Sequence, residues 1–171
     1  MKKIFLSLCV LSLLIITSCN NNDDDNGSTD PVDQLPPATQ TGENTVGFLI
    51  DGIPISVTNS NHIGAFFQQG QLQIGFGYED DYMDLSISIL ANSPLAVDTN
   101  YSLVNNSLVV KTNDDTNCFY DIDDTLEGIV RFTNIDETNF IISGFFEFTT
   151  VTEGCDTINI TEGRFDVQYA P

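Results

Sequence analysis

Apolar and polar residues alternate at every second position through most of this chain, and this limits the fold more than any other feature. In one of the clearest runs, Leu72, Ile74, Phe76 and Tyr78 are separated by Gln and Gly. Since neighbouring side chains of a β-strand point to opposite faces, such a run predicts a strand with one buried face. The pattern begins near Thr45 and includes no convincing long helix. We therefore expect an all-β domain.

Turn residues divide this pattern into short segments. Asp51-Gly52 is a strong signal for a two-residue hairpin, and Gln69-Gly70 indicates a second turn. Pro54 has no N–H to donate to a neighbouring strand, so its own strand should lie at the edge of a sheet or end there. Glu162-Gly163 has the composition of a β-bulge.

About nine or ten strands fit between the turn signals. We expect an antiparallel meander of consecutive hairpins, in which Tyr101–Val104 and Leu108–Val110 form a weaker pair. One apolar face per strand requires two packed sheets or one closed sheet, so the expected architecture is a β-sandwich or a flattened barrel. A single domain should span residues 45–171.

The N-terminal residues form a processing signal. Lys2-Lys3 precedes the apolar run Ile4–Ile16, which is shorter than the about 20 residues of a membrane span. The run leads into Ile16-Thr17-Ser18-Cys19, which resembles a bacterial lipobox. The resemblance implies a lipoprotein signal peptide at residues 1–18 and acylation of Cys19, which would anchor the protein without spanning the membrane. An ordinary secretory signal peptide is the alternative.

Residues 19–44 lack apolar periodicity and are rich in Asn, Asp and Pro. This composition predicts a disordered acidic tether, because it buries too little apolar surface to offset the entropy of ordering. Asp23, Asp24 and Asp25 resemble the surface-export signal of Bacteroidetes lipoproteins. The expected location is therefore the outer membrane with exposure at the cell surface, and the periplasmic face is the alternative.

Acidic residues dominate the charge of the chain. The 25 Asp and Glu oppose 5 Lys and Arg, which gives a formal net charge of −20 and a field that repels nucleic acid. The single His excludes three-His metal sites and multi-His catalysis. Once the signal peptide is removed, the basic residues are Lys111, Arg131 and Arg164.

Four cysteines are present, and they divide into two groups. Cys9 leaves with the signal peptide and Cys19 carries lipid, which leaves Cys118 and Cys155 in an oxidising compartment. We predict a disulfide between these two, and two free thiols are the alternative.

An acidic cluster follows Cys118 and is a weak candidate for Ca²⁺, which takes about 6–8 oxygen ligands. The residue order of an EF-hand loop is absent, and a solvated acidic loop is the alternative. No other metal or cofactor is expected. The cluster consists of Asp121, Asp123, Asp124 and Glu127.

No catalytic constellation stands out, so we do not expect an enzyme. His62 lies in a polar segment, and the Gly-x-Ser-x-Gly motif of a nucleophilic serine is absent. Glu147 and Asp166 are predicted on outward faces of adjacent strands, with Arg164 nearby. Paired carboxylates can hydrolyse a glycosidic bond, but a cross-strand salt bridge in which Arg164 clamps both groups is the simpler interpretation.

Sugar-binding surfaces usually present aromatic rings, and this chain has no Trp. Most of its 12 Phe fall on core-facing positions, which leaves as candidates Tyr78, Tyr82, Tyr101 and Tyr120. Asp124-Thr125-Leu126 and Asp156-Thr157-Ile158 resemble the O-glycosylation sequon of Bacteroidetes secreted proteins. Thr125 and Thr157 are therefore candidate modification sites.

Three longer segments resemble an uncharacterised Bacteroidetes lipoprotein family. They are the opening Leu35–Gly42, the Ser-Gly-x-Phe-x-Phe element Ser143–Phe148, and the closing Ile-Thr-x-Gly-Arg-Phe-Asp element from Ile160 to Asp166. The resemblance covers roughly Leu35 to Tyr169 and implies no activity. The chain departs from the family pattern after the first hairpin, where Pro54-Ile55 stands in place of the usual Trp.

These features predict a lipid-anchored cell-envelope protein that acts as a non-catalytic binding or accessory module. The expected partners are the membrane, through the lipid anchor, and a glycan or an envelope protein. The alternative is a secreted hydrolase or a subunit of a surface nutrient-capture system. A structural protein of the envelope is a third interpretation.

Overall fold

The computed structural model describes residues 30–80, 83–104, 108–112 and 117–171. The predicted signal peptide, Cys19, the acidic residues Asp23–Asp25 and Tyr82 lie outside these residues.

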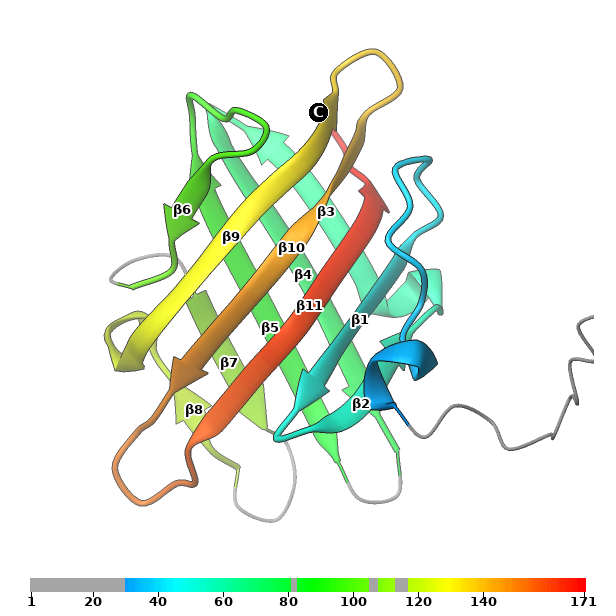
Figure 1. Ribbon diagram of the computed structural model, residues 1–171. Helices are drawn as coiled ribbons and strands as arrows, with labels where there is room; N and C mark the ends of the chain where they lie inside the picture. Colours follow the sequence, from blue (N-terminus) through cyan, green and yellow to red (C-terminus); the bar gives the residue numbers. More distant parts are fainter. Residues whose placement is uncertain (1–29, 81–82, 105–107, 113–116) are drawn as a thin grey trace, which may run out of the picture.

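The described part of the chain contains eleven β-strands and three short 3₁₀ turns, so the predicted all-β class is confirmed (Figure 1). The turns are η1 (Pro31–Gln34), η2 (Ser60–His62) and η3 (Ile122–Asp124). The strands are β1 (Thr45–Ile50), β2 (Ile53–Val57), β3 (Ile63–Gln68), β4 (Gln71–Glu79), β5 (Asp84–Asn92), β6 (Asn100–Ser102), β7 (Leu108–Thr112), β8 (Phe119–Tyr120), β9 (Thr125–Asp136), β10 (Ile141–Thr150) and β11 (Ile158–Gln168).

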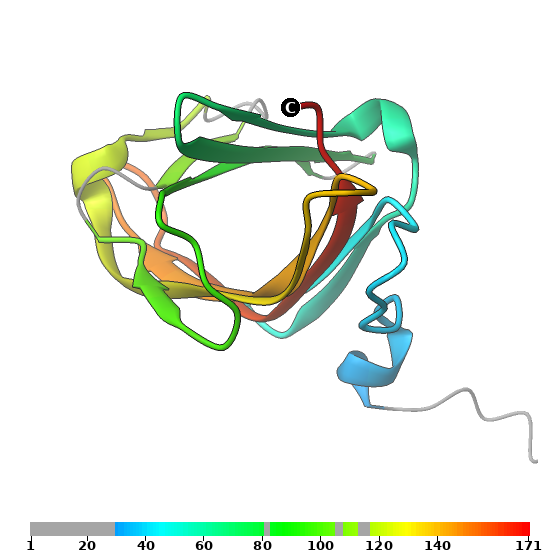
Figure 2. The ribbon, with the colours of Figure 1, turned by 90° about the horizontal axis from the view of Figure 1, so that it is seen from above.

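The strands form two antiparallel sheets that face each other as a β-sandwich (Figures 1 and 2). Sheet A has six strands in the order β2-β1-β11-β10-β9-β6, and sheet B has five in the order β3-β4-β5-β7-β8. Along one side, the chain after β11 joins the sheets. The Phe67 N–H donates to the Ala170 carbonyl at 2.8 Å, and the Ala170 N–H donates to the Ala65 carbonyl at 2.9 Å.

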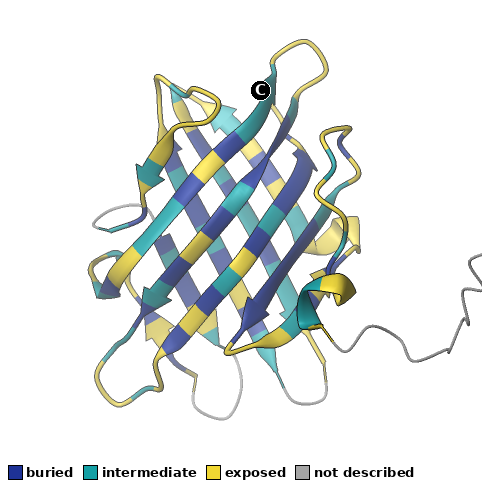
Figure 3. Cartoon of the chain, in the orientation of Figure 1, coloured by how far each residue is buried: buried dark blue, intermediate teal, exposed yellow. Residues whose placement is uncertain are grey.

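Apolar side chains from both sheets fill the space between them. The rings of Phe48 and Phe146 in sheet A and Phe76 in sheet B have centroids 5.4–6.1 Å apart. Buried and exposed residues alternate along most strands, as the period of two requires (Figure 3). The predicted apolar stripes therefore form the core.

Local turn chemistry agrees with the sequence-based predictions. Asp51-Gly52 and Gln69-Gly70 each close a two-residue hairpin with positive φ at both positions. Pro54 lies on β2, an edge strand of sheet A. Glu162-Gly163 coincides with a shift of register in the pairing of β11 with both β1 and β10, which is the predicted bulge.

The predicted pairing of the Tyr101 and Leu108 segments is wrong. β6 pairs with β9 in sheet A, whereas β7 pairs with β5 in sheet B. The reason is packing: the Tyr101 ring lies 5.6 Å from Phe132 of β9, and Leu103 is fully buried. The chain therefore crosses from one sheet to the other here, and the meander is interrupted.

Part of the predicted tether packs against the domain. Leu35 is buried, and the Pro36 ring lies directly over Gly47 of β1, where a Cβ atom would come within 2.5 Å of Pro36 Cδ. Both faces of β1 are consequently covered, and five of its six residues are buried. We call Leu35–Asn44 the connector, and it belongs to the folded domain although the predicted tether included it.

Candidate functional site

Two hollows reach between the sheets, and the larger, of about 380 Å³, opens at the end of the sandwich where Cys118 and Cys155 lie. The smaller has a volume of about 60 Å³ and is lined by Phe67, Leu72 and Tyr169 among others. Ligand sites in proteins usually measure about 300–1,000 Å³. Further hollows lie on the outer face of sheet A.

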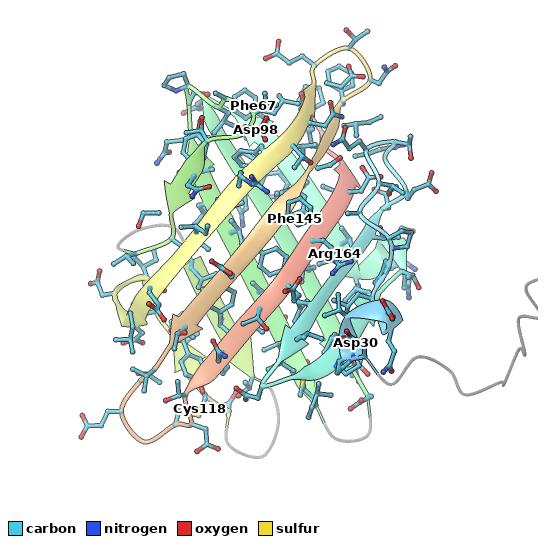
Figure 4. All side chains as sticks on the ribbon, in the orientation of Figure 1. Asp30, Phe67, Asp98, Cys118, Phe145 and Arg164 are labelled. Carbon is cyan, nitrogen blue, oxygen red and sulfur yellow. A yellow bond between two sulfur atoms is a disulfide. The ribbon has the colours of Figure 1, made fainter. Side chains whose placement is uncertain are left out.

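A row of functional side chains crosses the outer face of sheet A. Asn100 of β6 pairs with Arg131 of β9, which pairs with Phe145 of β10, and Phe145 pairs with Arg164 of β11. The residues on either side of Arg131 and of Phe145 are buried, so both of these side chains point outward. Figure 4 shows Phe145 and Arg164 on this face, on neighbouring strands.

Two adjoining hollows lie on the same face, and we call them together the sheet-A groove. One, of about 290 Å³, is lined by Arg131 and Phe145. The other, of about 350 Å³, extends towards the opposite end of the strands. Ile129 and Glu147 line both hollows. The remaining outward side chains of the groove are Asn100, Glu127, Thr149, Asn159, Thr161 and Glu162.

Arg131 is the most distinctive residue of the groove. Its guanidinium carbon lies 5.6 Å from the centroid of the Phe145 ring, which is a cation–π contact. Within the described residues the guanidinium makes no hydrogen bond and no ion pair. Its N–H donors are thus held above an aromatic ring and remain available to a ligand.

The carboxylates of the groove differ in their partners. Glu162 pairs with Arg164 at 3.8 Å, and the Arg164 Nε also donates to the Glu162 carbonyl at 3.4 Å. Among the residues that the structure describes, Glu127 and Glu147 accept no hydrogen bond and form no ion pair. The groove therefore offers both donors and acceptors from side chains on three long, paired strands.

The predicted salt bridge of Glu147 and Asp166 with Arg164 is wrong. Asp166 is 1% exposed, because the connector covers it, and Arg164 pairs with Glu162 instead. The carboxylate of Asp166 accepts hydrogen bonds from Thr39 Oγ1, Thr41 N, Gly42 N, Glu43 N and Ser143 Oγ at 2.7–3.1 Å. Asp166 therefore fastens the connector beside the groove.

Burial of the Asp166 carboxyl acts to raise its pKa, but the hydrogen bonds outweigh this effect. Donors from Thr39, Ser143, Glu43 and Gly42 favour the ionised form, and the pKa is lowered from its ordinary value. The carboxylate is therefore charged at neutral pH, and backbone and hydroxyl dipoles stabilise it.

The predicted disulfide is confirmed. Cys118 and Cys155 are bonded, with their Cα atoms 6.0 Å apart. Cys118 directly precedes β8 of sheet B, and Cys155 lies in the loop between β10 and β11 of sheet A. The bond thus ties the two sheets together at one end of the sandwich.

The acidic cluster after Cys118 has a structural role. The Asp121 side chain accepts from the Ile122 N–H at 2.7 Å, and the Asp124 side chain accepts from the Asp121 N–H at 2.8 Å, in a capping box around η3. Nowhere in the described residues do three His, Cys, Asp or Glu side chains form a group that could hold a metal. Ca²⁺ binding by Asp121, Asp123, Asp124 and Glu127 stays a prediction.

Most of the other candidate side chains are used by the fold. Tyr120 is buried and donates to the Asp156 carbonyl at 2.7 Å, while the Tyr101 hydroxyl donates to the Pro94 carbonyl at 3.1 Å. Neither tyrosine offers an open platform for a sugar. Thr125 is 4% exposed, so a glycan cannot be attached to it in the folded domain, whereas Thr157 is exposed.

Sequence reasoning missed Arg131 and Phe145 as site residues. The signal was present in the alternation, because Val130 and Phe132 point inward and therefore place Arg131 outward. The missing information was the register of β9 against β10, which sets Arg131 opposite Phe145.

In comparisons with known proteins, no family model, no curated protein and no solved structure matches this chain. In the described residues, no helix is long and apolar enough to cross a membrane.

Proposed function

We propose that the protein is a lipid-anchored, non-catalytic binding module of the cell envelope that holds its ligand in the sheet-A groove. The observation that carries this proposal is the pair of adjoining hollows in which Arg131 lies over Phe145 and Glu147 is shared.

The architecture supports binding on the outer face. The core between the sheets is filled, whereas the groove is open and polar. Most of its side chains project from β9, β10 and β11, which are long neighbouring strands of one antiparallel sheet, so they are held on a rigid platform. A rigid platform lowers the entropy that a ligand must overcome on binding.

The anchoring part of the proposal rests on the sequence. Cys19 would carry the lipid, and the acidic segment with Asp23, Asp24 and Asp25 would direct the protein to the outer membrane surface. The connector follows this segment and packs against β1 of sheet A, the sheet that bears the groove. In this arrangement the tether would hold the domain, and with it the groove, near the membrane surface.

Metabolic labelling with a clickable fatty acid tests the anchor. We expect wild-type protein to be labelled and recovered with membranes, and a Cys19→Ala variant to be unlabelled. Cys9→Ala is the matched control, since it removes a cysteine that the predicted signal peptide carries. Equal labelling of the wild type and Cys19→Ala would contradict the proposal.

A broad protease added to intact and to lysed cells tests the orientation. Digestion on intact cells supports surface display. Protection that is lost on lysis would place the domain on the periplasmic side and would contradict an export role for Asp23, Asp24 and Asp25.

One observation favours the alternative, a secreted hydrolase: Glu127 and Glu147 line the same hollow. Paired carboxylates are the usual machinery of glycoside hydrolysis. Release of reducing ends from a polysaccharide, abolished by Glu147→Gln, would replace the binding proposal with this one.

A further inference from the structure

We propose that the ligand of the sheet-A groove is a neutral oligosaccharide that spans both hollows. This inference rests on the proposed binding function and names its ligand class.

The groove matches the hydrogen-bonding character of sugars. A sugar hydroxyl both donates and accepts, so it needs donors and acceptors side by side. Arg131 supplies donors and Glu147 supplies acceptors, and both line the 290 Å³ hollow. Within the described residues neither side chain hydrogen-bonds to the protein, so binding a sugar would cost no internal hydrogen bond.

The hollow also offers apolar side chains on which a sugar ring can pack. Phe145 is half-buried and Ile129 lies between the two hollows, so C–H groups of a sugar ring can pack on them. Energetic centres of protein–protein interfaces are usually rich in Trp, Tyr and Arg in desolvated pockets. Among the outward side chains of this groove, one aromatic ring and one unpaired arginine stand beside Glu, Asn and Thr, which favours a polar ligand over a protein partner.

Charge disfavours an anionic ligand. Arg131 and Arg164 lie on the groove face, but Glu127, Glu147 and Glu162 outnumber them. The chain as a whole carries a net charge of −20. A polyanion such as a polyuronate or a sulfated glycan would therefore meet repulsion at long range and no net attraction in the groove.

The size and continuity of the groove favour a chain over a monosaccharide. Each hollow is close to the lower limit of about 300 Å³ for a small-molecule site, and the two are continuous through Ile129 and Glu147. Glu147, at the junction, would contact two successive sugar units. Substitution of Glu147 should therefore weaken binding more than substitution at either end.

Affinity electrophoresis of the whole chain, extracted from membranes in mild detergent, tests the inference. Native gels would contain soluble β-glucan, xylan, mannan or galactan, with polygalacturonate as the anionic comparison. We expect retardation by at least one neutral polysaccharide and none by polygalacturonate. Arg131→Ala should weaken the retarding interaction about tenfold, the equivalent of about one hydrogen bond to a charged group, and Glu147→Gln should weaken it further.

Two control variants make the same charge changes elsewhere. Glu153→Gln alters the exposed loop between β10 and β11, and Lys111→Ala alters the outer face of sheet B. Both should be retarded like the wild type. If Arg131→Ala fails to fold, Arg131→Lys serves instead, because it keeps the charge but loses the planar fork of donors.

Absence of retardation in every neutral gel, retardation by polygalacturonate alone, or equal retardation of Glu147→Gln and the wild type would overturn the inference. The anchor is tested separately by fatty-acid labelling. A chain that is lipidated but never retarded would overturn the sugar ligand alone. A chain that is retarded but carries no lipid would overturn the anchor alone.

Discussion

Asp166 shows how one residue can join a chain segment to a sheet. Its carboxylate accepts hydrogen bonds from the connector and from Ser143 of the neighbouring strand, and no Lys or Arg of the described residues pairs with it. The connector consequently packs on β1 and on β11, and its Gln40 reaches β9 through hydrogen bonds with Thr133 and Asn134. The connector and the groove therefore occupy neighbouring parts of the outer face of sheet A.

Replacement of Asp166 by Asn should lower the free energy of unfolding by about 2–3 kcal/mol, because an amide presents only one acceptor oxygen to these buried donors. Asp51→Asn is the matched control, since Asn suits the positive φ of 50° in that turn, and we expect little change. Denaturant unfolding measures both variants. Equal stability of Asp166→Asn and wild type would contradict the role of this carboxylate.

The lowered pKa of Asp166 also predicts a pH dependence. A carboxyl whose pKa is lower in the folded state stabilises the protein above its unfolded pKa, and this stabilisation is lost as the pH falls through the folded value. Below about pH 4 the wild type should therefore lose stability faster than Asp166→Asn. Parallel pH profiles of the two proteins would contradict this prediction.

Thr150 and Thr125 face each other across β10 and β9, and both hydroxyls are buried without a hydrogen-bond partner in the described structure. Thr150→Val should raise the free energy of unfolding by about 1 kcal/mol, because it removes an unsatisfied polar group at almost constant volume. Thr149→Val is the control, since its hydroxyl donates to Asn159 at 3.1 Å. A stabilisation of Thr149→Val equal to that of Thr150→Val would argue against this explanation.

The strands and their turns were the most predictable elements, because their causes are local. Asp51-Gly52 specifies its hairpin by backbone preference alone. The pairing of β6 with β9 and the burial of Asp166 under the connector depend on contacts between segments far apart in sequence. The alternation of apolar and polar residues does not encode such contacts. For the same reason the sequence could place Arg131 and Phe145 each on an outward face, but it could not show that the two side chains are neighbours.

The disulfide connects elements of different sheets, so its removal should act on the whole sandwich. For the 37-residue separation of Cys118 and Cys155, chain entropy predicts a loss of about 3–4 kcal/mol in the Cys118→Ala/Cys155→Ala variant. Reduction of the wild type should have a similar effect. Calorimetry of the oxidised, reduced and doubly substituted proteins measures this, and three equal unfolding temperatures would contradict it.

At the scale of the whole molecule, charge opposes the compact state. The chain has a net charge of −20, and within its described residues one Arg–Glu ion pair is formed. Mutual repulsion of the acidic residues should therefore destabilise the fold at low ionic strength.

Salt should consequently stabilise the protein. From about 0.01 M to about 1 M NaCl the screening length falls from about 30 Å to about 3 Å, and the melting temperature should rise by several degrees. KCl at the same concentrations should raise the melting temperature equally, since screening depends on ionic strength. A melting temperature that is constant or falls with salt would contradict the electrostatic account.

The central claim is that the outer face of β9, β10 and β11 binds the ligand, and a fluorescence titration tests it most directly. The chain has no Trp, so Phe145→Trp places a single reporter in the groove, and Phe66→Trp places one on the outer face of sheet B, where Phe66 is 43% exposed. Both variants would be titrated with the neutral polysaccharides of the gel panel after their retardation has been checked. The account predicts a saturable blue shift for Phe145→Trp and no change for Phe66→Trp. An equal response of both reporters, or a response of Phe66→Trp alone, would contradict it.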